Sequence, residues 1–232
     1  LGTQIKYMIE ALVGSGKFEV ISLGGAIDHP NYEPIRVEEY GNDWIILPVK
    51  GYGDVNIVRG ILATHKPDIL WFMTDPRFYE WLWEIENEIR QHIPMVYYHV
   101  WDNFPAPRFN KKFYDSNDYI ASISKLTSTI VQEVSPEVQE KYIPHAVNTE
   151  IFRKYDRDTG EKANIANIKN TNDSLKGKVV FFWNNRNARR KQSGTLVFWF
   201  KEFLDRVGHD KATLLMHTDA RDPHGQPLDF LM

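Results

Sequence analysis

The fold is indicated most clearly by the stretch Met95-Val-Tyr-Tyr-His99-Val-Trp-Asp102, a short apolar run that ends in polar and aromatic side chains. The run is rich in β-branched and aromatic residues, as expected for a strand with both sheet faces covered. It predicts a strand at residues 95–100. Similar runs predict strands at residues 18–23, 44–49, 68–73, 119–124, 179–183 and 213–217.

Segments with helical spacing separate these strands. Apolar side chains fall on one helical face within residues 5–12, 55–62, 78–89, 126–134 and 196–207. The segment 78–89 is predicted to be one amphipathic helix whose glutamates, including Glu80 and Glu88, face water. Six aromatic residues are expected to be mostly core and not acceptor surface: Trp71, Phe72, Phe78, Tyr79, Trp81 and Trp83. Strands that alternate with helices, without hairpin turns, predict an α/β fold with parallel sheets.

The composition turns polar between residues 153 and 178, which we interpret as a linker or surface excursion. Residues 1–152 are predicted to form a doubly wound, parallel-sheet (Rossmann-like) N-terminal domain. Residues 179–232 are predicted to begin a second Rossmann-like domain. The total of 232 residues suits one large domain or two small ones.

The composition excludes several classes of protein. At 42% hydrophobic and 13% aromatic residues, the chain can bury a core, so it is not disordered. It has no cysteine, which excludes disulfides, thiolate metal ligands and a cysteine nucleophile. Its 28 basic and 31 acidic residues give a net charge of -3, so a general nucleic-acid binder is not expected. Without an apolar run of about 18 residues or a signal-peptide pattern, a cytoplasmic location is expected.

Three patterns are too incomplete to predict a bound metal or nucleotide. The segment Gly14-Ser-Gly-Lys17 lacks the earlier glycine of a phosphate loop and precedes a strand, so a helix end and a turn are expected. The segment Asp156-Arg-Asp158 has a divalent-metal spacing but lies in the polar segment, with no strand before it. The eight histidines lack zinc-ligand spacing. We therefore expect no metal and no cofactor.

Two places in the first domain carry candidate site residues. Gly2 and Thr3 lead into the first helix, where backbone N–H groups can bind an anionic or hydroxylated ligand; an ordinary helix cap explains them equally well. His99 and Asp102 end a predicted strand, at the edge where open α/β sheets bind ligands. A histidine there can accept a proton or hydrogen-bond a hydroxyl, and Trp101 can stack on a sugar. The alternative for His99 is a buried side chain satisfied by backbone groups.

The strand at 179–183 runs into a strongly basic loop, Asn184-Asn-Arg186-Asn-Ala-Arg-Arg-Lys191, before a helix that starts near residue 193. Cations at the carboxyl end of a strand and beside a helix N-terminus form a compact cradle for a diphosphate. A solvated basic loop is the alternative. A nucleic-acid patch is not expected, because the surrounding sequence is not basic.

Five segments, in chain order, are similar to the motifs of one enzyme family: Gly2-Thr3-Gln4, Asp118-Tyr-Ile-Ala-Ser-Ile-Ser124, Tyr142-Ile-Pro-His-Ala-Val-Asn-Thr-Glu-Ile-Phe152, Arg186 with Lys191, and Leu214-Leu-Met-His-Thr-Asp219 with Asp222-Pro-His-Gly-Gln-Pro-Leu228. They resemble the retaining glycosyltransferases of the GT-B fold, specifically the family-four nucleotide-sugar transferases. Three positions depart from that pattern, since Ala146, Asn184 and Gln192 stand where the family has, or often has, a glycine.

The resemblance implies a GT-B-like enzyme that moves a sugar, with retention of configuration and without a metal, from a nucleotide-sugar donor to a glycan, lipid or small-molecule acceptor. Arg186 and Lys191 are expected to bind the donor and neutralise the leaving diphosphate, with Gly2 and Thr3 as further donor-binding residues. The nucleotide sugar is a substrate, so no cofactor is implied. No nucleic-acid partner is expected, and peripheral membrane contact stays open.

The resemblance also implies that His99 is catalytic, by hydrogen-bonding the donor sugar or positioning the acceptor, with Asp102 orienting it. Compared with the family, the first strand and most of the C-terminal domain, including a paired-glutamate motif, are missing. The chain is therefore expected to be a fragment that does not turn over by itself. Two alternatives remain open: a GT-B-like sugar-nucleotide epimerase or phosphorylase, and a non-catalytic module that binds glycan or protein.

Overall fold

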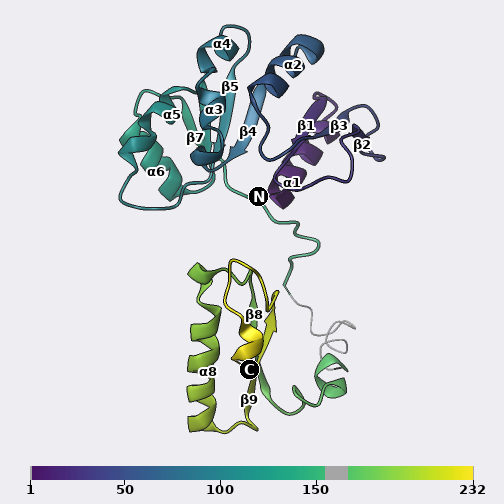
Figure 1. Ribbon diagram of the computed structural model, residues 1–232, viewed down its shortest axis with the longest axis vertical. Coiled ribbons are helices and arrows are strands. Elements are labelled where there is room, and N and C mark those ends of the chain that lie inside the picture. Colours follow the sequence, from purple (N-terminus) through teal and green to yellow (C-terminus); the bar gives the residue numbers. More distant parts are fainter. Residues whose placement is uncertain (1, 155–166, 232) are drawn as a thin grey trace. The chain divides into compact units, whose positions relative to one another are not determined.

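The computed structural model describes residues 2–154 and 167–231, so the motif at Asp156 and Asp158 lies outside the described residues. The chain divides into two compact units, which we call unit 1 (Leu1–Asn148) and unit 2 (Thr149–Met232) (Figure 1). Within both described ranges, no helix is long and apolar enough to cross a membrane.

Both units contain strands and helices that follow one another along the chain. Unit 1 contains α1 (Gly2–Gly14), β1 (Val20–Gly24), β2 (Ile35–Arg36), β3 (Trp44–Pro48), α2 (Val55–His65), β4 (Leu70–Thr74), η1 (Pro76–Phe78), α3 (Glu80–Trp83), α4 (Glu86–Arg90), β5 (Met95–His99), η2 (Arg108–Asn110), α5 (Lys111–Asp115), β6 (Tyr119–Ser122), α6 (Lys125–Val134) and β7 (Glu140–Tyr142). Unit 2 contains β8 (Val179–Asn184), η3 (Arg189–Lys191), α8 (Ser193–Val207), β9 (Ala212–His217) and η4 (Leu228–Phe230). The seven predicted strands are confirmed to within a few residues, as are four of the five predicted helices.

Two sheets form unit 1, with strand orders β1-β3-β2 and β4-β5-β6-β7. Their strands pair in parallel, except that β2 is antiparallel to β3. Thr74 lies opposite His99, and His99 opposite Ser122, so the carboxyl ends of three strands share one edge. The expectation of parallel pairing alone is wrong at β2, because a two-residue strand is too short to leave a hydrophobic pattern.

Helix α1 joins the two sheets of unit 1. Ile9 is buried in a cluster with Trp44 of the first sheet. Met8 packs against a cluster that contains Met73 of the second sheet, and Ile5 packs against both clusters. The apolar face predicted from the helical spacing of this segment is therefore the face that covers the junction.

The segment 14–17 is a helix end and a turn, as predicted. Helix α1 ends at Gly14, and the N–H of Ser15 donates to the carbonyl oxygen of Ala11 at 3.2 Å. Gly16 has a φ of 68°, in the left-handed region that favours glycine after a helix.

The prediction of one amphipathic helix over 78–89 is wrong, since this region forms η1, α3 and α4 in succession. Leu82, Trp83 and Ile89 are all buried. Leu82 and Trp83 both lie in α3, whereas Ile89 lies in α4, and the break at Ile85 lets both short helices place these side chains in one core cluster. Glu80 and Glu88 are exposed as expected.

The six predicted core aromatics mostly lie in the core. Phe72 and Trp83 are buried, and Trp71, Tyr79 and Trp81 pack partly buried against the core clusters. Phe78 differs, because it is 41% exposed and stacks on Tyr52 with ring centroids 4.4 Å apart.

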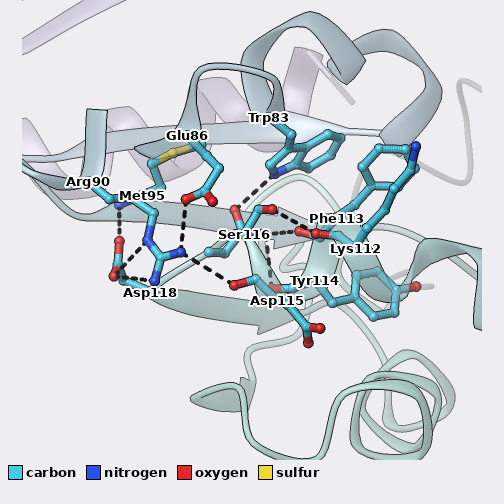
Figure 2. Close-up of polar contacts among 11 residues, drawn as sticks. Trp83, Glu86, Arg90, Met95, Lys112, Phe113, Tyr114, Asp115, Ser116 and Asp118 are labelled. Carbon is cyan, nitrogen blue, oxygen red and sulfur yellow. Dashed lines mark hydrogen bonds and ion pairs between the residues drawn. The ribbon is translucent and has the colours of Figure 1, made fainter. Parts of the chain in front are cut away.

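A set of hydrogen-bonded side chains connects α4 to the starts of β5 and β6 (Figure 2). The Arg90 Nε donates to Asp118 Oδ1 at 3.1 Å, and its Nη1 donates to Glu86 Oε2 at 3.0 Å. The other oxygen of Asp118 accepts the N–H of Met95 at 2.8 Å. One carboxylate therefore satisfies the first amide of β5 and a guanidinium from the covering helix.

Unit 2 is built on the parallel pair β8–β9, with α8 running alongside it (Figure 1). The ring of Phe181 lies 5.5 Å from that of Phe200 and 5.8 Å from that of Phe203, so α8 covers one face of the pair. Residues 167–171, within the predicted linker, are helical, and Leu175 is buried. This strand–helix–strand unit has the parallel topology expected at the start of a second Rossmann-like domain.

Replacing Asp118 by alanine is expected to lower the free energy of unfolding by about 1–2 kcal/mol, because Met95 and Arg90 each lose a hydrogen-bond partner. Urea unfolding followed by tryptophan fluorescence measures the change. The control, Glu88→Ala, removes an exposed ion pair with Arg59, and we expect no measurable loss. Equal losses in the two variants would contradict the role assigned to Asp118.

Candidate functional site

His99, the predicted catalytic histidine, ends β5 and has no exposed surface. Its Nδ1 lies 2.9 Å from the hydroxyl of Tyr97, and its Nε2 lies 2.7 Å from the hydroxyl of Tyr114. The Tyr97 hydroxyl donates its proton to the carbonyl oxygen of Thr74 at 2.6 Å, so it accepts from His99. Nδ1 therefore carries the ring proton, and Nε2 accepts the proton of Tyr114.

Burial lowers the pKa of His99 to about 3, although the nearby Asp75 carboxylate opposes this shift. Burial likewise raises the pKa of Tyr114 to about 12. Both side chains are therefore neutral at physiological pH, and the ring is satisfied by tyrosine hydroxyls instead of backbone groups. A direct catalytic role for His99 stays a prediction.

Asp102 lies in the exposed loop between β5 and η2. Because both ring nitrogens of His99 bind tyrosines, any effect of Asp102 on the ring is not through a direct hydrogen bond. Trp101 is partly buried against the core, and its indole N–H donates to the carbonyl oxygen of Asn103 at 3.1 Å. Of the two predicted catalytic residues, His99 and Asp102, only Asp102 is therefore accessible to a ligand.

Gly2 and Thr3 form the exposed first turn of α1. The next residue, Gln4, makes two hydrogen bonds with the backbone of Ala146. Its Nε2 donates to the carbonyl oxygen at 2.7 Å, and its Oε1 accepts the N–H at 3.1 Å. The segments 2–4 and 142–152, both noted for the family resemblance, are therefore in contact. They are far apart in the sequence, so no local pattern predicts this contact.

The basic loop of unit 2 leaves the carboxyl end of β8 and ends in η3, directly before α8. Arg186 is exposed and Lys191 is half-buried. Gln192, which stands where the resembled family has glycine, has a φ of 52° and a ψ of 40°. These angles lie in the left-handed region that favours glycine. The expected turn is therefore present, with a glutamine adopting it.

Two buried side chains, Asn187 and Ser193, and the half-buried Gln226 hold this loop. The Asn187 Nδ2 donates to the carbonyl oxygen of Gln226 at 2.6 Å, and its Oδ1 accepts the Ser193 hydroxyl at 2.6 Å. The Gln226 side chain accepts the N–H of Gly194, in the first turn of α8, at 2.8 Å. Asn187 and Ser193 have no exposed surface. The sequence gives no signal for this group, because its members contact across two loops.

Arg186 forms a two-point ion pair with Asp222, in the loop after β9. The Nε donates to Oδ2 at 2.6 Å, and Nη2 donates to Oδ1 at 3.2 Å. The hydrogen bond from Arg186 lowers the pKa of the Asp222 carboxyl, and the carboxylate raises the pKa of Arg186. The pair is therefore ionised at neutral pH. Asp222 lies in a segment noted for the family resemblance, but the sequence assigns it no role.

The two units present different chemistry at their strand ends. Unit 1 presents an exposed carboxylate, Asp102, and a buried neutral imidazole, His99, whereas unit 2 presents a loop with four cations at residues 186, 189, 190 and 191. Such a loop can bind phosphate groups. Within the described ranges, no group of three or more histidine or acidic side chains is placed to hold a metal ion.

No family model matches the sequence, and no curated protein matches it significantly. Among solved structures, the chain is similar to the apo structure of OtsA, a glycosyltransferase of the GT-B fold, with a TM-score of 0.63 and 9% sequence identity. The similarity covers 97% of this chain and 64% of the OtsA chain, so the chain spans less than two thirds of that protein. At this identity the likeness concerns the fold alone. The predicted GT-B-like, Rossmann-like α/β fold is confirmed.

We expect the free energy of unfolding of unit 1 to fall by about 2 kcal/mol between pH 7.5 and pH 5 through His99. The folded pKa is about 3, against an ordinary value of 6.5, so the unfolded chain binds the extra proton between these values. Stability from this group is therefore full above about pH 6.5 and lost as the pH falls.

Urea unfolding at a series of pH values measures this dependence. The variant His99→Gln can still donate and accept hydrogen bonds but does not titrate, so most of the dependence should disappear. An unchanged pH slope in the variant would contradict a buried, neutral imidazole.

Proposed function

We propose that the chain is part of a glycosyltransferase that takes its sugar from a nucleoside-diphosphate sugar, with unit 2 binding the donor diphosphate. The observation that carries this proposal is the basic loop 186–191, which leaves β8 at its carboxyl end and leads into α8. Loops in this position bind ligands in open α/β sheets. The likeness of the fold to OtsA supports the same conclusion.

Arg186 and Lys191 supply the positive charge. When the bond between sugar and diphosphate breaks, negative charge grows on the leaving group, and fixed cations stabilise it. A guanidinium has five N–H groups, and three of those on Arg186 are not bound by Asp222. Because Gln226 already accepts the N–H of Gly194, we assign the diphosphate to the loop side chains and not to that amide. In this proposal the cations act in place of a metal.

Unit 1 carries the acceptor side of the proposed reaction. We assign His99 as a positioning residue that holds the end of β5 through its two tyrosines, and Asp102 as the accessible carboxylate that binds an acceptor hydroxyl. Gly2 and Thr3, which the family resemblance assigns to the donor, form an exposed helix start where backbone N–H groups can bind it. Retention of configuration, and a glycan, lipid or small molecule as acceptor, complete the proposal on the strength of the family resemblance.

Isothermal titration with UDP, GDP and ADP, without added metal, is expected to find at least one that binds. Arg186→Ala and Lys191→Ala should each weaken that binding about tenfold, since each removes a charged hydrogen bond to phosphate. Arg206→Ala, in the last turn of α8, is the matched control and should leave the affinity unchanged. A chain that binds none of the three nucleotides, or binds them equally well in both loop variants, would contradict the proposal.

A labelled nucleotide sugar separates this proposal from its two alternatives, in a protein that contains this chain and turns over. Label on an added acceptor supports a glycosyltransferase. Interconversion of the nucleotide sugar without an acceptor indicates an epimerase, and transfer of the sugar to inorganic phosphate indicates a phosphorylase. A protein that binds glycan but no nucleotide is a binding module.

A further inference from the structure

We propose that Asp222 is a positioning residue that holds Arg186 ready to bind a nucleoside diphosphate. This inference rests on the proposed function, because it assigns a support to the donor site of unit 2. Asp222 touches no ligand in this proposal. It acts by fixing the direction in which the guanidinium of Arg186 faces.

The geometry of the Arg186–Asp222 ion pair fixes the orientation of the guanidinium. Two N–H groups on one edge of the Arg186 guanidinium, at Nε and Nη2, bind the two oxygens of Asp222. This leaves the edge formed by Nη1 and the outer N–H of Nη2 for another partner, and that edge also matches two phosphate oxygens. The Arg186 side chain is 63% exposed, whereas that of Asp222 is only 9% exposed. The carboxylate is therefore enclosed while the guanidinium reaches solvent.

The protein backbone places the carboxylate independently of Arg186. Asp222 Oδ1 accepts the N–H of His224 at 2.9 Å, and the N–H of Gly225 donates to the Asp222 carbonyl oxygen at 2.9 Å. A Cβ added at Gly225 would overlap the carbonyl oxygen of Asn187, so the two loops are in close contact there. This contact brings the turn that carries Asp222 directly against the loop that carries Arg186.

Holding an arginine before the ligand arrives favours binding. A free arginine side chain has many rotamers, and fixing it at the moment of binding weakens affinity. The ion pair with Asp222 has already restricted these rotamers. The negative charge of Asp222 acts in the opposite direction, but it lies on the other edge of the guanidinium, farther from a bound phosphate than the positive charge is, so the attraction exceeds the repulsion. We therefore expect net support for diphosphate binding.

The test measures affinity for whichever of UDP, GDP or ADP binds best, and for the nucleoside without phosphates. Asp222→Asn should weaken the nucleotide about tenfold and leave the nucleoside unchanged. Asp222→Glu, which keeps the charge, should recover part of the loss. In an Arg186→Ala background, Asp222→Asn should cause no further loss, because there is no guanidinium left to position.

The control is Asp229→Asn, which removes another arginine–aspartate ion pair of unit 2, in which Arg221 contacts one oxygen of Asp229. We expect it to leave the nucleotide affinity unchanged. Urea unfolding identifies any variant that is not folded. If Asp222→Asn is not folded, the nucleotide affinity of Asp222→Glu is compared with that of the wild type. A lower affinity supports the positioning role, and an unchanged affinity overturns it.

Nucleotide affinity that is unchanged or higher in Asp222→Asn would overturn the positioning role. The same holds for an equal loss in the Arg186→Ala background. In both cases, wild-type binding that depends on Arg186 would leave the proposed function intact. A wild-type chain that binds none of the nucleotides would overturn both proposals.

Discussion

Parallel strand pairing is the constraint on which the candidate site of each unit depends. In unit 1, the register of β4, β5 and β6 places Thr74, His99 and Ser122 at one edge. In unit 2, the pairing of β8 with β9 brings Asn184 beside His217, whose Nδ1 lies 3.0 Å from the asparagine Oδ1. The loops that follow these strands start side by side, so residues far apart in the sequence can contact one another.

Each edge is backed by buried polar side chains whose hydrogen bonds are made within the protein. In unit 1 this group is centred on His99, and in unit 2 on Asn187, and both side chains have no exposed surface. Hydrogen bonds are strong in such surroundings, and an unpaired polar group is costly there, so these groups fix the loops around them. The groups that can meet a ligand, Asp102 and Arg186, lie outside these buried supports.

The hydrophobic pattern predicted most of the fold because burial leaves a periodic trace in the sequence. It failed at β2, which is too short for a period, and at Ile85, where α3 ends and α4 follows although the helical spacing of apolar residues continues. In the site, Arg186 and Lys191 could be predicted because cations directly follow a strand. The ion pair of Arg186 with Asp222 could not, since contacts between loops 36 residues apart depend on the tertiary structure.

A nucleoside diphosphate is proposed to bind at the basic edge of unit 2, the carboxyl end of β8 with the loop 186–191. Nuclear magnetic resonance of the isotope-labelled chain, titrated with the nucleotide and with its nucleoside, tests this residue by residue. We expect the nucleotide to shift the amide signals of residues 185–195 and 218–226, and the nucleoside to shift the signals of the basic loop 186–191 much less. Nucleotide shifts that gather elsewhere, or identical shifts with the nucleoside, would contradict the claim.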